Sequence, residues 1–296
     1  MDTDEIFNIV IKVIKAGERG VCFDSSLDIL IVTDQDVDGL REKISAFISG
    51  TDWLFVIADV EDLSLAEKVA ECIKEFKSLP TSPSFSLPYY SMPCEITKSG
   101  KIINRGELLT REIKCPLVTS IILCPSAEDA RLKNINSNFG TWIILPKDKI
   151  AETGLTNGEI IYQVIEKITC IVPMNCLCLI GMDFIDVVEK LENQGRACIG
   201  FGESLDAENN SLAAVKNALK SPFFIEDIGK AKKGLLIFVG NNESLNMMDV
   251  NEAADFLNGK LRQSEDICDG ILWQVVSDET ANDGVPAFVL ATNFEK

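Results

Sequence analysis

The sequence predicts an α/β protein in which a doubly wound parallel sheet is followed by a smaller α+β domain with a mixed sheet. Apolar runs at 27–33 and 53–58 are nearly continuous, which is typical of strands that are covered on both faces. Segments with helical spacing separate such runs, and this alternation favours a parallel sheet. Near the end of the chain, two strand patterns follow each other across a polar turn, which favours a mixed sheet.

Residues 1–155 are expected to form the domain with the parallel sheet. It opens with a predicted helix at 4–16, because apolar residues recur there at helical spacing and Gly17 follows. The other elements expected in this domain are strands at 27–33, 53–58, 117–123 and 142–145 and helices at 37–48 and 65–77. Together they give the alternating order that a doubly wound sheet requires.

A proline-rich insertion at 77–114 interrupts this alternation. Proline cannot continue a helix or take a central position in a sheet, and the segment carries prolines at positions 80, 83, 88 and 93. We interpret it as a loop or flap, which is either an ordinary surface excursion or a partner-binding arm that uses Tyr89 and Tyr90. Within it, the loose alternation over 95–104 is compatible with an edge hairpin.

A central helix and connector are expected at 156–180, and a C-terminal α+β domain at 181–296. The helix, at about 157–172, should be the longest, and its broad apolar stripe suits a helix packed between two domains. The stripe consists of Ile160, Ile161, Val164, Ile165 and Ile168. The C-terminal domain is predicted to contain helices at 184–193, 208–220 and 249–259 and strands at 196–202, 234–239, 270–277 and 285–292. A polar turn at 278–284 joins the last two strands as a pair.

The composition excludes several classes of function. The formal net charge is -18, which opposes binding to nucleic acid and direct contact with an anionic membrane surface. The chain has no histidine, the usual general base and zinc ligand, and its 10 cysteines show no CxxC spacing. The N-terminus is acidic, and no apolar run is long enough to span a bilayer. We therefore expect a cytoplasmic protein without a metal site.

Residues 196–224 carry a set of short motifs, namely Gly200-Phe201-Gly202, Ala213-Ala214 and Ser221-Pro222. With these motifs the segment resembles the start of the C-terminal domain of FtsZ, the bacterial cell-division tubulin, and the resemblance continues through 225–257. Upstream, residues 141–150 resemble the family's Thr-Leu-Ile-Val-Ile-Pro-Asn-Asp-Arg-Leu segment. The chain is identified as a divergent member of the tubulin–FtsZ superfamily, which implies a tubulin/FtsZ-like fold.

The glycine loops that hold GTP in this family are expected to be absent. Residues 15–21 resemble the end of the first FtsZ helix, and in this register the family's first strand and its phosphate loop are missing. The second loop, the tubulin signature GGGTGTG, is replaced by Asp59, Val60, Glu61, Asp62, Leu63 and Ser64. In the family, glycine lets backbone N–H groups approach the phosphates, because it has no side chain.

Three carboxylates, those of Asp59, Glu61 and Asp62, now stand at the phosphate position. Lys147 also replaces an asparagine that faces the nucleotide in the family. Anions that face each other in a partly desolvated site cost on the order of several kcal/mol, so we expect neither GTP binding nor any other cofactor. The alternative is a cation, Mg²⁺ or Ca²⁺, held by the three carboxylates.

One functional element of the family is expected to be retained. In FtsZ, an acidic loop after the central helix enters the nucleotide pocket of the next subunit and promotes hydrolysis in trans. Asp183 and Asp186 match its two aspartates, although the asparagine of the motif is missing. The same three-residue spacing places both carboxylates at the start of a helix, where they would stabilise its N-terminus. The sequence leaves both roles open.

These features lead to the hypothesis of an FtsZ-like cytoskeletal scaffold or regulator that is not an enzyme. It would associate with FtsZ-type subunits or with itself. The alternative is a divergent, GTP-binding and filament-forming FtsZ homologue with a rearranged pocket. A third hypothesis is a module that binds a small molecule or a partner in the crevice at the carboxyl ends of the parallel strands.

Overall fold

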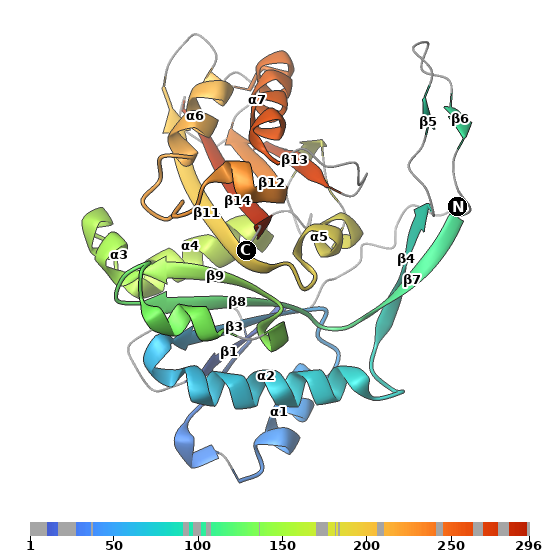
Figure 1. The fold of residues 1–296 in the computed structure, drawn as a ribbon, viewed down its shortest axis with the longest axis vertical. Helices are drawn as coiled ribbons and strands as arrows, with labels where there is room; N and C mark the ends of the chain where they lie inside the picture. Colours follow the sequence, from blue (N-terminus) through green and yellow to red (C-terminus); the bar gives the residue numbers. More distant parts are fainter. Residues whose placement is uncertain are drawn as a thin grey trace.

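The structure is a computed structural model of the 296-residue chain. It describes residues 11–16, 28–36, 38–90, 95–96, 102–104, 108–135, 137–169, 177–180, 182, 184–205, 210–240, 245–262, 269–277 and 284–294. Within these residues, ten strands form one sheet in the order β10-β13-β12-β14-β11-β9-β8-β3-β1-β2 (Figure 1). The half that ends in β2 is parallel and the other half is mixed, so the predicted fold class is confirmed.

Five strands from the first half of the chain make up the parallel part of the sheet. They are β1 (Ile11–Ala16), β2 (Asp28–Val32), β3 (Trp53–Asp59), β8 (Leu117–Cys124) and β9 (Thr141–Pro146). Every neighbouring pair among them is parallel, so their carboxyl ends meet at one edge of the sheet. All residues of β3 and β8 are buried, as expected for strands covered on both faces.

Strand β1 corrects the predicted helix at 4–16, which is wrong over residues 11–16. β1 lies between β2 and β3, and Val13 stands opposite Ile29 on one side and Phe55 on the other. A short apolar run fits the spacing of a helix and that of a strand equally well. Here the pairing with two neighbouring strands decides in favour of a strand. A central parallel strand therefore precedes β2, where the sequence register predicted none. Residues 1–10 and 17–27 lie outside the described residues.

Helices cover both faces of the parallel strands. The helices of this part are α1 (Leu40–Ile48), α2 (Leu63–Ser78), α3 (Lys147–Thr153), α4 (Asn157–Thr169) and α5 (Phe184–Leu191), with short turns η1 (Asp34–Asp36), η2 (Val60–Asp62), η3 (Ala130–Asn134) and η4 (Ser137–Phe139). Leu54 and Val56 of β3 share a core with α1 and α2, whereas Phe55 and Ile57 share a core with α4 and α5. The predicted apolar stripe of α4 is confirmed, because all five of its isoleucine and valine residues are at most 2% exposed. The expectation that this helix is the longest is wrong for the described residues, because α4 has 13 residues and α2 has 16.

The mixed part of the sheet contains the remaining long strands. Its elements are β10 (Leu177–Ile180), β11 (Gly195–Ser204), α6 (Asn210–Ala218), η5 (Ile228–Lys230), β12 (Ala231–Gly240), α7 (Met247–Lys260), β13 (Gly270–Ser277) and β14 (Val285–Phe294). The last two strands are not a pair, which corrects the sequence prediction. β12 lies between them, antiparallel to β14 and parallel to β13. Burial agrees with this order, because β12 is buried along most of its length and lies further inside the sheet than β13, whose first four residues are only partly buried.

The two parts of the sheet join where β9 and β11 run parallel over three residue pairs, from Gly195 opposite Thr141 to Ala197 opposite Ile143. Further along β11, the motif Gly200-Phe201-Gly202 lets α6 pack directly on the strand. A Cβ on Gly202 would lie 2.2 Å from the carbonyl oxygen of Ala214, and one on Gly200 would lie 2.1 Å from that of Ala218. The two glycines are therefore required by the close approach of backbone to backbone.

The proline-rich insertion forms a two-stranded ribbon that projects from the body (Figure 1). β4 (Ser84–Tyr90) pairs with β7 (Leu108–Lys114), and beyond them β5 (Glu95–Ile96) pairs with β6 (Ile102–Asn104). The predicted hairpin at 95–104 is confirmed. The interpretation as a loop or flap missed β4 and β7, because Pro88 is acceptable in a strand that has a partner on one side only. Whether this ribbon binds a partner stays open.

None of the described helices is long and apolar enough to cross a membrane.

We expect the substitution Gly202→Ala to lower the free energy of unfolding by about 1–3 kcal/mol, because the added methyl group collides with the backbone of α6. The matched control is Gly259→Ala in α7, where a Cβ would meet nothing within 4 Å. That variant should be unchanged or up to about 1 kcal/mol more stable, because alanine favours the helix. Urea unfolding of both variants measures the difference. Equal stabilities would contradict the packing argument.

Candidate functional site at the carboxyl edge

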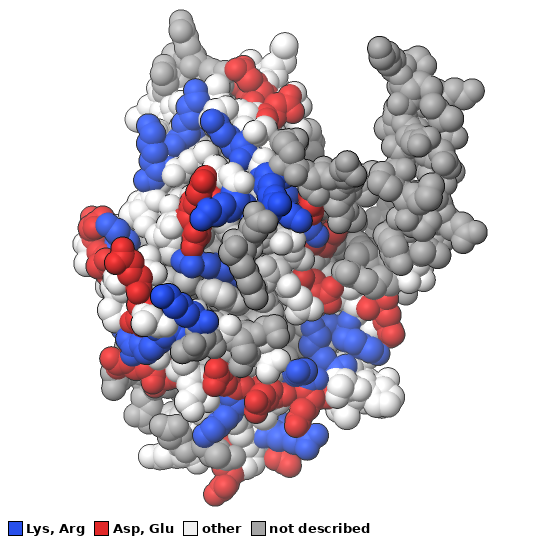
Figure 2. All heavy atoms as spheres, in the orientation of Figure 1, with Lys and Arg blue, Asp and Glu red and all other residues white. Residues whose placement is uncertain are grey.

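The surface charge of the molecule is not uniformly acidic. Figure 2 shows Lys and Arg side chains gathered in several places on the visible face, although the formal net charge is -18. The electric field at a particular site therefore depends on the charged groups within a few ångströms of that site rather than on the net charge of the chain.

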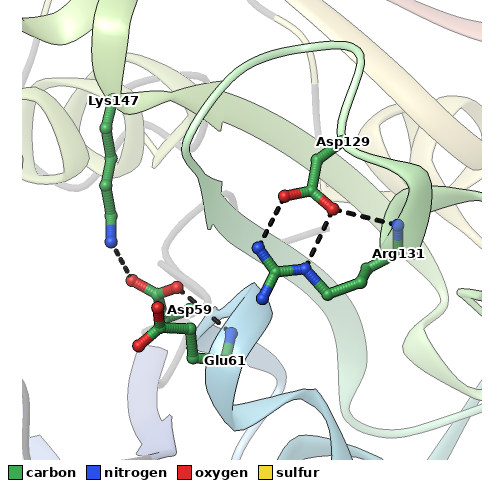
Figure 3. A network of polar contacts seen from close by, with 5 residues as sticks. All are labelled: Asp59, Glu61, Asp129, Arg131 and Lys147. Atoms are coloured by element: carbon green, nitrogen blue, oxygen red, sulfur yellow. Dashed lines mark hydrogen bonds and ion pairs between the residues drawn. The ribbon is translucent and has the colours of Figure 1, made fainter.

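Five polar side chains from three segments meet at the carboxyl edge of the parallel strands (Figure 3). Asp59 ends β3, and Glu61 follows in η2. Asp129 and Arg131 come from the connection after β8, and Lys147 begins α3 directly after β9. Because β3, β8 and β9 are adjacent parallel strands, residues up to 88 positions apart lie together here. This edge is the usual ligand site of a doubly wound sheet.

Asp59 is the most buried member of this group. Its side chain is 8% exposed, and its carboxylate pairs with the ammonium group of Lys147. The other carboxylate oxygen accepts a hydrogen bond from the backbone N–H of Glu61 at 3.2 Å. Asp59 therefore caps η2, which leads directly into α2, while its charge is neutralised by Lys147.

Arg131 and Asp129 form a second, bidentate ion pair beside the first. The Nε atom of Arg131 donates to Asp129 at 2.9 Å, a terminal guanidinium nitrogen donates to the other carboxylate oxygen at 2.6 Å, and the Arg131 backbone N–H also donates to Asp129. These hydrogen bonds lower the pKa of Asp129 to about 2. The pKa of Arg131 is raised, chiefly by the hydrogen bond to Asp129 and to a smaller extent by the negative charge of Asp59.

The segment from Asp59 to Ser64 does not present the three unpaired carboxylates that the sequence suggested. Asp59 is paired, Val60 is buried, and Glu61 is exposed. One carboxylate oxygen of Asp62 is buried without a hydrogen-bond partner among the described residues, and Leu63 and Ser64 form the first turn of α2. The alternative of a bound cation gains no support, because the described part of the chain contains no group of three His, Cys, Asp or Glu residues arranged to hold a metal ion.

Of the two aspartates expected to act in trans, Asp183 lies outside the described residues. Asp186 stands in the first turn of α5, at the opposite end of β3 from Asp59. Phe184, at the start of α5, packs against Trp53 with ring centroids 5.8 Å apart. Trp53 begins β3 and Asp59 ends it, a separation of about 20 Å along an extended strand. Within one chain, Asp186 therefore does not reach the carboxyl edge.

Sequence reasoning missed Asp129 and Arg131. Their position in the sequence could have indicated them, because they lie in the connection that follows the buried strand β8. The carboxyl end of that strand is at the same edge of the sheet as Asp59 and Lys147. The ion pair between Asp59 and Lys147 has no sequence signal either, because the two residues are 88 positions apart and only the pairing of β3, β8 and β9 brings them together.

Comparison with known proteins supports this architecture, although no family model matches the chain. FtsZ 2 of Thermococcus kodakarensis is 29% identical over 196 residues, which cover 60% of this chain and 45% of that protein. FtsZ of Helicobacter pylori is 27% identical over 177 residues, which cover 56% of this chain and 44% of that protein. The chain thus spans less than half the length of these relatives.

Solved structures extend the likeness to nearly the whole fold. An empty FtsZ dimer of M. jannaschii superposes with a TM-score of 0.63 at 17% identity and covers 96% of this chain and 88% of its own. A protofilament of CetZ2 from Haloferax volcanii has a TM-score of 0.60 at 13% identity and covers 92% of this chain and 80% of its own. The chain therefore has the fold of the tubulin–FtsZ superfamily. In sequence the chain is similar to FtsZ, and the relatives named above are described as cell-division proteins.

The expectation that the chain is not an enzyme is wrong, because its curated relatives are FtsZ proteins, which are GTPases. That expectation rested on electrostatic repulsion between phosphates and three carboxylates. The structure weakens this reasoning, since Lys147 neutralises Asp59, and the neighbouring Arg131 and Asp129 neutralise each other.

We expect the pair of Asp129 and Arg131 to make stability depend on pH in the acid range. The pKa of Asp129 is about 2 in the folded chain, below the ordinary value of 3.8. Its contribution to stability is therefore complete above the ordinary pKa and is lost as the pH falls through about 2. In the variant Arg131→Met, NMR titration of the Asp129 carboxyl should show a pKa raised towards the ordinary value. An unchanged pKa would mean that Arg131 is not its partner in solution.

Proposed function

We propose that the chain is a subunit of an FtsZ-like cytoskeletal polymer in the cytoplasm, with a rearranged pocket that binds a guanine nucleotide at the carboxyl edge. It would contact copies of itself, or FtsZ-type subunits, from head to tail. The observation that carries this proposal is the position of the two candidate surfaces at opposite ends of β3. Asp59 and its neighbours lie at one end, and the start of α5 lies at the other.

The carboxyl edge offers the chemistry that a phosphate group requires. Lys147 and Arg131 supply two cations, and their side chains are 36% and 44% exposed. The 16-residue helix α2 begins at the same edge, and the partial positive charge of its N-terminus favours an anion. The segment from Asp59 to Ser64 contains no glycine, so at this segment a nucleotide would depend more on side chains and less on backbone N–H groups than the family pattern implies.

Head-to-tail assembly follows from the distance between the two surfaces. Because Asp186 cannot meet the carboxyl edge of its own chain, a role in a nucleotide pocket requires a second subunit. A contact between two different surfaces builds a ring where the rotation between subunits closes and a filament where it does not, and the proposal is the filament. The superposed CetZ2 structure is a GTPγS-bound protofilament, and the superposed M. jannaschii FtsZ structure is a dimer, which supports assembly of this kind.

We also propose the division into a domain at 1–155, the central helix and connector at 156–180, and a C-terminal domain at 181–296. In support, α4 shares one hydrophobic core with strands of both parts of the sheet, including Phe55 and Ile57 on one side and Ile237 and Leu290 on the other.

Sedimentation of the full chain with GTP, with GDP and without nucleotide tests the proposed function. We expect polymer to pellet with GTP, and phosphate to be released at a rate that rises with protein concentration, because the pocket is completed by the next subunit. Failure to pellet with GTP, both alone and mixed with an FtsZ-type protein, would overturn the proposal.

The variants Asp183→Asn and Asp186→Asn should lower phosphate release by at least about tenfold and leave nucleotide binding to the monomer unchanged, because these residues would act on the neighbouring subunit. The matched control is Asp249→Asn, which removes another carboxylate from the first turn of a helix, α7. If Asp249→Asn lowered phosphate release equally, stabilisation of a helix N-terminus would explain the effect.

A further inference from the structure

Both residues of one ion pair, Asp59 and Lys147, depart from the family pattern. Asp59 stands in the segment that replaces the glycine signature, and Lys147 replaces an asparagine expected to face the nucleotide. The two positions are 88 residues apart, yet their side chains are paired. Either residue alone would leave an uncompensated charge at a partly buried edge, whereas together they neutralise each other.

Both oxygens of the Asp59 carboxylate are engaged, one by Lys147 and one by the backbone N–H of Glu61. An anion is therefore already present at the carboxyl edge, and it belongs to the protein. The second pair repeats this arrangement, because the carboxylate of Asp129 holds the guanidinium of Arg131.

In both pairs the cation is the more accessible partner. The side chain of Lys147 is 36% exposed and that of Asp59 is 8% exposed, and the values for Arg131 and Asp129 are 44% and 12%. An anion from solvent therefore reaches each cation without first crossing the carboxylate. An ammonium group carries three donors, so Lys147 can begin a contact with an incoming oxygen before it leaves Asp59.

We propose that Asp59 is an internal competitor for the phosphate site, and that a phosphate group of a nucleoside di- or triphosphate binds Lys147 by displacing Asp59 from it. This inference rests on the proposed function, because it assigns the ligand's phosphates to this edge. Asp59 then sets the affinity of the edge for phosphate, and Lys147 supplies the attraction. The exchange replaces one ion pair by another and involves no covalent step.

The test uses inorganic pyrophosphate as the probe and isothermal calorimetry of the full chain as the measurement. In Asp59→Asn the amide oxygen can still accept the hydrogen bond from Glu61, while the competing charge is lost. We expect this variant to bind pyrophosphate at least about tenfold more tightly than the wild type, which corresponds to about 1.4 kcal/mol. Adding Lys147→Met should abolish the gain.

The matched control is Glu128→Gln. Glu128 is an exposed carboxylate in the connection after β8, and the substitution changes the net charge by the same amount without touching either ion pair. Its affinity for pyrophosphate should stay within about twofold of the wild type. An equal gain in Glu128→Gln and Asp59→Asn would show a general charge effect and would overturn the proposal.

A second readout does not depend on ligand affinity. The rate at which an amine-reactive reagent acylates Lys147, followed by mass spectrometry of the peptide, should rise in Asp59→Asn and fall again when pyrophosphate is added. Asp59→Ser serves if the asparagine variant does not fold, because serine can also cap the turn. An acylation rate unaffected by removing the Asp59 carboxylate would overturn the proposal.

The outcomes separate this inference from the proposed function. If the wild type assembles with GTP but Asp59→Asn gains no affinity for pyrophosphate, the proposed function stands and the competition by Asp59 is refuted. If Asp59→Asn binds pyrophosphate more tightly but the wild type never assembles with GTP, Asp59 is a competitor at an anion site and the proposed polymer function fails.

Discussion

Burial of β3 on both faces is the constraint on which the rest of the structure depends. Its seven residues are all buried, so helices must cover the sheet from two sides. Successive side chains of β3 point to opposite faces of the sheet. Leu54 and Val56 therefore lie in the core beneath α1 and α2, and Phe55 and Ile57 lie in the core beneath α4 and α5. The same strand separates the two candidate surfaces, because its polar end residue Asp59 emerges at the carboxyl edge and the start of α5 packs on Trp53.

The chemistry of the carboxyl edge depends on pairing rather than on composition. A net charge of -18 and three acidic residues in one short segment suggest repulsion of any phosphate. The structure pairs Lys147 with Asp59 and Arg131 with Asp129, so two of the carboxylates at this edge are neutralised and two cations are within reach of solvent. Charges more than about 10 Å away are screened, so the groups at the edge itself decide how it meets an anion.

The likeness to FtsZ and the departures from it fall on different parts of the molecule. Gly200 and Gly202, which match the family pattern, are required here because α6 would otherwise collide with β11. The departures that we infer from the resemblance, at Asp59 and Lys147, gather at the carboxyl edge, where the two side chains pair with each other. The close packing of α6 on β11 and the side chains at the carboxyl edge thus lie in different parts of the fold.

The sequence by itself determined most of the elements of this protein. The strands at β2, β3, β8 and β9 and the buried stripe of α4 followed from periodicity, which is a local property of the chain. It did not determine that residues 11–16 form a strand, that β12 separates β13 from β14, or that Lys147 meets Asp59. Those three features depend on contacts between distant segments, and only the tertiary structure decides which strands pair and which charges neutralise each other.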